Sequence, residues 1–306
     1  MGDILICYNI CGISGKENVQ SYLENIYSIL NQTIFLKTKT HLVISSCMSS
    51  SETINRLVEE FGSKVSFNLI KEVVPVNVSF NHSCQKISKL IDIDSFVYVD
   101  SGITFSSKTT LEELFDMVKP NVGMVSCNSD NDSGLPEWFL NTNNGRVPNA
   151  PFVMPIGCAH NLHVQIFHRK IQDAYSKIIP DIFAANCTES VFTFICSAIG
   201  LVWVVNPNIM VHHKKAMDGP SSGFGFIHPW DYTFKSPRSM CEICSDPLAL
   251  ECGFGYEECN RILMHDPDKF VNGISIDSRL FTFIKDNLYL KSKNFDYDKI
   301  QHEWIP

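Results

Sequence analysis

The sequence predicts an α/β fold, with a Rossmann-like, mostly parallel twisted sheet and helices on both of its faces. Short apolar runs alternate with segments of helical periodicity from Ile4 to Ser126. Strands that are separated by helices pair in parallel, because each crossover carries the chain back across one face of the sheet. Polar residues follow three of the strands, and ligands bind at the carboxyl ends of strands in such sheets.

Each strand and helix has its own local signal. Short apolar runs predict the strands Ile4–Tyr8, His41–Ser45, Val65–Ile70, Phe96–Val99, Val122–Ser126, Leu162–His168 and Leu201–Val205, the last of them ended by Pro207. Apolar residues at helical spacing predict the helices Val19–Leu30, Ser49–Phe61, Ser79–Ile91, Thr109–Lys119, Thr188–Gly200 and Ser278–Asn287. A Ser/Thr-x-x-Glu pattern marks helix starts at Ser14, Ser49 and Thr109.

The composition favours a globular protein that does not bind nucleic acid. With 44% hydrophobic and 19% charged residues, the chain of 306 residues is able to bury a large core. Its net charge of -8 gives no overall attraction to nucleic acid, so a nucleic-acid partner is not expected. The apolar run Val191–Val205 is too short to span a bilayer, and the N-terminus lacks a signal-peptide pattern. We therefore expect a cytoplasmic protein whose cysteines are reduced.

Several segments, in this order along the chain, together resemble family 2 glycosyltransferases. They are Tyr8-Asn9, the helix from Ser21 that ends Ser28-Ile29-Leu30-Asn31-Gln32-Thr33, Ser79-Phe80-Asn81-His82-Ser83, Phe96-Val97-Tyr98-Val99-Asp100, Thr188-Glu189-Ser190 and Val211-His212-His213. The resemblance implies a GT-A fold for residues 1–215. It also implies transfer of a sugar, with inversion, from a nucleotide-sugar donor to an acceptor hydroxyl of a glycan, a lipid-linked sugar or another molecule.

The resemblance also implies roles for individual residues. Asp100, together with His212 and His213, takes the place of the site for a divalent metal, Mn or Mg, which would stabilise the departing diphosphate. Glu189 takes the place of the catalytic base that removes the proton of the acceptor hydroxyl. Donor-binding positions are Tyr8, Asn9, Ser45, Asn81, Asp100 and Ser101, and Gly157–His163 is expected on the acceptor side.

The sequence departs from the family pattern at three places. The Asp-x-Asp motif that ends the metal strand is reduced to Asp100-Ser101-Gly102, and Ser190 replaces the second member of the acidic dipeptide. Ser45-Ser46-Cys47 stands where the family has acidic residues, one of which reads the base. Lys214 and Lys215 are an alternative source of positive charge for the diphosphate. The literal Asp92-Ile93-Asp94 precedes its strand and is read as a solvated loop.

Residues 216–306 are expected to form a lid loop and a cysteine-containing C-terminal extension. The Gly- and aromatic-rich segment Ser222–Phe226 is suited to fold over the donor and exclude water. Four cysteines, Cys241, Cys244, Cys252 and Cys259, are either the ligands of a structural zinc ion or four free thiols in a packed extension.

Two other functions remain open at this stage. The missing acid of the Asp-x-Asp motif favours a degenerate GT-A fold that binds without catalysing. A nucleotidyltransferase-like enzyme on a similar sheet is the other alternative, although Gly12-x-x-Gly15-Lys16 lacks the spacing and the Ser/Thr of a phosphate-binding loop. The sequence carries no signal for the oligomeric state.

Overall fold

The protein is described by a computed structural model, which carries side chains. The residues that the structure describes are 2–12, 17–72, 74, 76–130, 149–154, 163–181, 188–214, 278–290 and 296–306. The predicted lid, the four cysteines of the predicted zinc site and most of the predicted acceptor segment lie outside these residues. No helix among the described residues is long and apolar enough to cross a bilayer.

A single sheet of ten strands forms the centre of the molecule. The strands are β1 (Asp3–Cys11), β2 (Thr40–Cys47), β3 (Ser66–Ile70), β4 (Ile93–Val99), β5 (Ile103–Thr104), β6 (Val122–Ser129), β7 (Phe152–Val153), β8 (Val164–His168), β9 (Val202–His213) and β10 (His302–Ile305). Their order across the sheet is β10-β3-β2-β1-β4-β8-β6-β9-β5, with β7 paired to β9.

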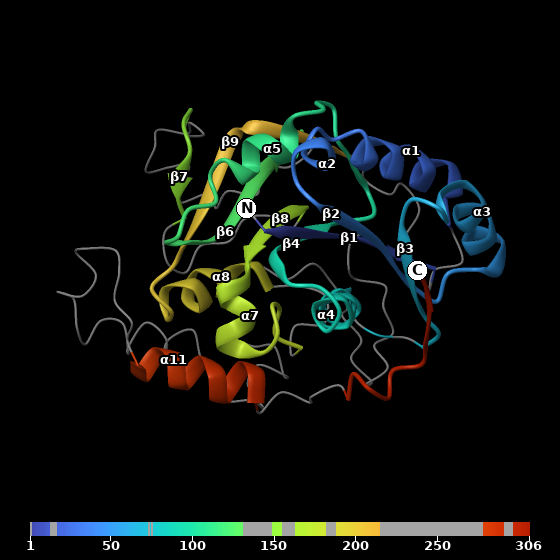
Figure 1. Cartoon of the computed structure of the whole chain (residues 1–306). Helices are drawn as coiled ribbons and strands as arrows, with labels where there is room; N and C mark the ends of the chain where they lie inside the picture. The colour runs from blue at the N-terminus through green and yellow to red at the C-terminus, as the bar shows by residue number, and fades with distance from the viewer. Residues whose placement is uncertain are drawn as a thin grey trace, which may run out of the picture.

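Helices cover both faces of the sheet, which confirms the expected α/β fold (Figure 1). One face carries α1 (Val19–Leu30), α2 (Ile34–Lys37), α3 (Ser51–Phe61) and α5 (Thr110–Phe115). The opposite face carries α4 (Val76–Ser88), α7 (Arg169–Tyr175), α8 (Thr188–Ser197) and α11 (Ser278–Ile284), which continues as the π-helix η3 (Lys285–Leu290).

Strand pairing is mixed, so the expected mostly parallel sheet is found only in part. The block β3-β2-β1-β4 is parallel, as is the pair of β6 and β9. In contrast, β8 lies between β4 and β6 and is antiparallel to both. The connection of β6 to β8 passes through β7 and spans residues 130–163, and a connection of this length leaves the direction of the next strand free.

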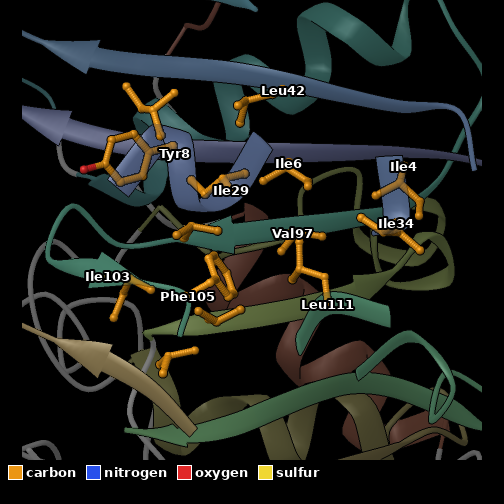
Figure 2. Close-up of a cluster of buried hydrophobic side chains, with 14 of the residues drawn as sticks. Ile4, Ile6, Tyr8, Ile29, Ile34, Leu42, Val97, Ile103, Phe105 and Leu111 are labelled. Carbon is orange, nitrogen blue, oxygen red and sulfur yellow. The ribbon is translucent and has the colours of Figure 1, made fainter. Parts of the chain in front are cut away.

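The core on the α1 face follows the alternation of side chains along β1. Ile4, Ile6 and Tyr8 point to this face and contact apolar residues of α1 and β4, such as Ile29 and Val97 (Figure 2). Leu5 and Cys7 point to the opposite face and join the core beneath α4. Because successive side chains alternate, β1 is buried on both faces, as expected for a central strand of an α/β sheet.

Several predicted boundaries differ from the structure, and two of these differences have a physical reason. Pro207 does not end its strand: β9 continues to His213, and the register with β6 shifts between Cys127 and Asn128, so that the irregularity accommodates the missing N–H. Glu17 does not complete a capping box for α1, whose N-cap is Asn18. Its carboxylate accepts instead from the backbone N–H of Ser50 at 2.9 Å, at the start of α3.

The C-terminal segment returns to the same sheet. β10 pairs antiparallel with β3, from His302 opposite Ile70 to Ile305 opposite Phe67, and forms the edge of the sheet. The sequence pattern did not predict this strand, because four residues carry too little periodicity to be recognised. The domain boundary at residue 215 stays a prediction, although the final residues of the expected extension belong to the central sheet.

Candidate active site

Two buried side chains fix the turn that follows β4 through hydrogen bonds to its backbone. The Tyr8 hydroxyl donates to the carbonyl of Ser101 at 2.8 Å, and Asn25 Nδ2 donates to the same carbonyl at 2.7 Å. Thr104 Oγ1 in turn donates to Asn25 Oδ1 at 2.6 Å. Burial raises the pKa of the Tyr8 hydroxyl well above its ordinary value, so this hydroxyl stays a donor. The turn that bears Asp100 is thereby fixed on the sheet.

Asp100, His163 and His213 form a cluster that is able to hold a metal ion. One potential ligand atom from each residue lies within 4.8 Å of the others. His213 Nε2 lies 3.8 Å from Asp100 Oδ2, and the ring centroids of His163 and His213 are 4.1 Å apart. Donor atoms around one ion of this kind lie roughly 3 to 4 Å apart, since each bond is about 2.1 Å long. The cluster therefore fits a divalent ion after a small closing of the side chains.

Three strand ends bring this cluster together. Asp100 follows β4, and its N–H donates to the carbonyl of His163, the residue before β8, at 3.0 Å. His213 is the last residue of β9 and lies opposite Ile103 of β5. These chain segments lie far apart in the sequence, so the cluster exists only because β8 is antiparallel to β4 and β5 is antiparallel to β9.

Gly102 explains why the Asp-x-Asp motif is incomplete. A Cβ at Gly102 would lie 2.8 Å from the carbonyl oxygen of Lys214 and 2.9 Å from Cδ2 of His213. The N–H of Lys214 also donates to the carbonyl of Gly102 at 2.9 Å, which keeps the two chains at this close approach. The ring of His213 thus occupies part of the space that a side chain at position 102 would need, and its imidazole is a potential metal ligand at this place.

His212 lies outside the cluster, although the sequence analysis expected it beside Asp100 as a metal ligand. Its Nδ1 is paired with the carboxylate of Asp130, on the side of β9 opposite to the ring of His213. Successive side chains of a strand point to opposite faces, so His212 and His213 cannot both reach Asp100. Asp130 also accepts from the backbone N–H of His213 at 3.0 Å and fixes the end of β9.

Charges around the cluster are partly balanced. Burial raises the pKa of the Asp100 carboxyl. Two neighbours oppose this effect: the N–H of Ser101, which donates to Asp100 Oδ1 at 2.8 Å, and the ring of His213. Lys214 forms an ion pair with Glu24, with Nζ and Oε2 2.9 Å apart. This pair engages Lys214, one of the two lysines that the sequence suggested as a substitute for the metal, and Lys215 lies outside the described residues.

Three of the predicted donor-binding residues make contacts within the protein. Tyr8 holds the turn, as described above, and Ser45 is buried with its Oγ 2.7 Å from Ser79 Oγ beneath α4. Asn81 accepts from the N–H groups of Ile178 and Ile179, at 3.3 and 3.2 Å. These three side chains thus serve the packing of the fold, and their direct contact with a donor is not supported.

Asn9 is the predicted donor-binding residue that keeps an unused polar atom. It lies near the carboxyl end of β1, is 3% exposed, and its Nδ2 donates to the carbonyls of Cys7 and Val99 at 3.2 and 3.4 Å. Its Oδ1 has no hydrogen-bond partner among the described residues. Since Val99 directly precedes Asp100, the side chain of Asn9 lies beside the turn that bears Asp100.

A buried histidine of α4, His82, is expected to make stability depend on pH. Burial, with repulsion from His302 and Lys86, lowers the pKa of His82 to about 4, and its ring stacks on Tyr297 with centroids 6.3 Å apart. In the unfolded chain a histidine titrates near about 6.5, so the unfolded state binds a proton before the folded state does. The free energy of unfolding should therefore decrease by roughly 2 kcal/mol as the pH falls from about 6.5 to about 4.

Urea unfolding at several pH values between these limits measures the effect. In a His82→Gln variant the decrease should be smaller by about this amount, because glutamine does not titrate. Equal slopes of stability against pH in the two proteins would contradict this assignment.

Glu189 lies in the first turn of α8, and its role as the base stays a prediction. His163 was expected on the acceptor side, and the sequence analysis did not place it in the candidate cluster. One signal for a further metal ligand was present, because a carboxylate and an imidazole alone, from Asp100 and His213, are too few ligands for a metal ion. However, nothing local to His163 distinguishes it from a structural histidine.

Comparisons with known proteins identify the fold. No protein-family model matches the sequence, and no curated protein matches it. Among solved structures, the chain is similar to the mannosyltransferase PcManGT from Pyrobaculum calidifontis, determined in complex with GDP-Man and Mn2+. The match covers 94% of this chain and 88% of that chain, with a TM-score of 0.51 and 14% sequence identity. The chain therefore has a glycosyltransferase-like α/β fold.

Proposed function

We propose that this protein is a metal-assisted glycosyltransferase that uses a nucleotide-sugar donor and an acceptor hydroxyl. The observation that carries the proposal is the cluster of Asp100, His163 and His213 at the carboxyl end of β4. Ligands bind at this edge of α/β sheets. The structural neighbour is a mannosyltransferase determined with a nucleotide sugar and Mn2+, which supports the same class of reaction here.

The reaction needs a neutralised leaving group and an activated acceptor. A divalent ion, when bound, supplies Lewis-acid stabilisation of the charge on the leaving diphosphate. In this proposal Asp100, His163 and His213 hold the ion, and the turn fixed by Tyr8 keeps Asp100 in place. Asn9, whose buried Oδ1 has no hydrogen-bond partner among the described residues, lies beside this turn and is kept as a proposed donor-binding residue.

Proton removal is assigned to Glu189. A carboxylate within hydrogen-bond reach of the acceptor hydroxyl takes its proton as the oxygen attacks the anomeric carbon. Direct attack on the face opposite to the leaving diphosphate inverts the anomeric configuration, in keeping with the family 2 resemblance. Both the base and the inversion rest on that resemblance.

A ligand screen tests the proposed donor class. Thermal unfolding is measured with UDP-, GDP-, CMP- and dTDP-sugars, each with and without Mn2+. A ligand that binds only the folded state raises the free energy of unfolding, by about 2.7 kcal/mol at a ligand concentration of 100 times Kd, and therefore raises the melting temperature. We expect one nucleotide to raise it only when Mn2+ is present. No shift with any of them at millimolar concentration would overturn the proposal.

One observation favours a second function, a binding protein without catalysis. Gly102 removes one acidic ligand of the family motif, and the described part of the chain offers three ligands in total at this site. A binding protein would show the Mn2+-dependent shift in melting temperature and release no nucleoside diphosphate. A nucleotidyltransferase-like enzyme would instead release pyrophosphate, so product analysis separates the three functions.

A further inference from the structure

We propose that the C-terminal segment, residues 296–306, is a pH-sensitive strap that is closed at neutral pH and opens when His82 and His302 take up protons. The two rings face each other across the contact between α4 and β10, with centroids 4.5 Å apart and an angle of 69° between their planes. Figure 1 shows the strap in red beside β3, at one edge of the sheet. The inference stands independently of the proposed sugar transfer, since no ligand takes part in it.

A small set of contacts holds the strap closed. Its strand β10 pairs with β3 over 4 residues. Ile300 is buried in a small cluster with Cys47 and Ile70, the last residues of β2 and β3. The Tyr297 hydroxyl donates to the buried carboxylate of Asp181. Because these contacts are few, the strap is able to open while the rest of the sheet stays folded.

His302 is neutral when the strap is closed. Its Nδ1 lies 2.8 Å from the carbonyl oxygen of Ile300, and its Nε2 lies 3.3 Å from Nζ of Lys86. A carbonyl oxygen only accepts and an ammonium group only donates, so Nδ1 carries the proton of the ring and Nε2 accepts from Lys86. A second proton, on Nε2, would face the ammonium group directly. Protonation of His302 therefore breaks this contact between the strap and α4.

His82 is constrained in the same way. It is 4% exposed, and its Nδ1 lies 3.0 Å from Nδ2 of Asn68. That amide nitrogen also donates to Ser83 Oγ at 2.8 Å, so Nδ1 of His82 is an acceptor. A proton on Nδ1 would place two donors against each other, and burial keeps bulk water away from the new charge. The closed strap is therefore the form in which both rings are neutral.

The charges around His82 add to this effect. Lys86 and Lys89 of α4 repel a protonated ring, as does His302 of the strap. Asp298 of the strap has the opposite effect, but its carboxylate is 88% exposed and lies 3.4 Å from Lys89 Nζ. Burial first, and then repulsion from His302 and Lys86, lower the pKa of His82 to about 4.

The other charged groups that face the strap are engaged with partners. The ion pairs are Lys71–Glu303, Lys177–Asp181 and, within the strap, Asp296–Lys299, and the Glu72 carboxylate accepts from the N–H of Gln301. Carboxyl groups ordinarily titrate near about pH 4. A change of pH from about 7.5 to about 5 therefore acts mainly on histidine.

The sign and the size of the effect follow from proton binding. A histidine in contact with water titrates near about pH 6.5. The closed strap binds the proton more weakly than the open one, so its stability is complete above about pH 6.5 and is lost as the pH falls toward about 4. Through His82 alone, the ratio of open to closed strap should rise about 30-fold between about pH 7.5 and about pH 5.

Hydrogen exchange of the full chain, measured by mass spectrometry at about pH 7.5 and about pH 5, tests the inference. Intrinsic exchange rates at each pH are divided by the observed rates, which removes the direct effect of pH on the chemistry of exchange. We expect the protection of amides in the strap to fall about 30-fold. Amides of β1 should stay at least about tenfold more protected than the strap at both pH values, because they exchange only when the whole sheet opens.

Three histidine variants make the test specific. His82→Gln should reduce the fall in protection to about threefold or less, since glutamine still accepts a hydrogen bond and does not titrate. His302→Gln should also reduce it, and this half-buried position tests the contact without altering the core. His41→Gln is the matched control: its ring pairs with Asp3 at the start of β2, so the full fall should remain. Circular dichroism checks that each variant is folded.

Each outcome decides for or against the strap. Equal protection of the strap at the two pH values would overturn the inference, as would the wild-type fall in folded His82→Gln and His302→Gln. Equal protection of the strap and of β1 at the lower pH would also overturn it, since the strap would then open only with the whole protein. A fall that is reduced in both of these variants and kept in His41→Gln supports the strap, whether or not a nucleotide sugar binds.

Discussion

Replacing Asp100 with asparagine should abolish Mn2+ binding and reduce nucleotide-sugar turnover by roughly 100-fold or more. Asp100 provides the one carboxylate of the cluster, and an amide oxygen is a much weaker ligand for a divalent ion. The change should preserve the fold, because the asparagine Oδ1 is still able to accept from the N–H of Ser101, now 2.8 Å away. Mn2+ titration and kcat/KM measure the two effects.

Asp92→Asn is the matched control for this variant. Asp92 directly precedes β4, and the literal Asp-x-Asp sequence that it begins continues into this strand, contrary to the expected loop. Its side chain is 82% exposed and paired with Arg169. The change removes the same charge from an aspartate outside the cluster, so Mn2+ affinity and turnover should remain those of the wild type. Unchanged Mn2+ affinity in Asp100→Asn, or a comparable loss in Asp92→Asn, would contradict the placement of the site.

Restoring the family motif by Gly102→Asp should damage the site instead of repairing it. The new Cβ would lie 2.8 Å from the backbone oxygen of Lys214 and 2.9 Å from His213 Cδ2, so the turn or β9 has to move. Overpacking of this kind costs about 1 to 3 kcal/mol. We expect a lower melting temperature and, because His213 is displaced, Mn2+ affinity weakened by about tenfold or more.

Gly102→Ala separates the two contributions in this variant. Alanine adds only the Cβ, so it should reproduce most of the loss in stability and in Mn2+ affinity without adding a charge. The contrary result is a Gly102→Asp protein that is as stable as the wild type and binds Mn2+ more tightly. It would show that the packing against His213 does not exclude a second acid at position 102.

The parallel half of the fold could be predicted because its signals are local. The strands from Ile4 and Phe96 and the helix from Val19 each have their own periodicity, and parallel pairing follows from their alternation. The position of Asp100 at a strand end follows from the same pattern. By contrast, β10 and the antiparallel direction of β8 depend on chain segments that meet only in the folded protein.

The candidate cluster was predicted in part, and its two differences from the prediction have separate causes. With a strand ended at Pro207, nothing indicated that His212 and His213 would alternate on opposite faces. Once β9 runs to His213, the alternation assigns only one of them to the cluster. His163 joins the cluster through the pairing of β4 with β8, a contact between residues distant in sequence that no local pattern contains.

Release of nucleoside diphosphate from a nucleotide sugar tests the account most directly. The protein is incubated with the nucleotide sugar that raises its melting temperature, with and without Mn2+, and the products are separated by chromatography. The account predicts slow release that requires Mn2+, is accelerated by a hydroxyl acceptor and is lost in Asp100→Asn. Release at the same rate without the ion and in Asp100→Asn, or no release with Mn2+ at saturating donor, would contradict it.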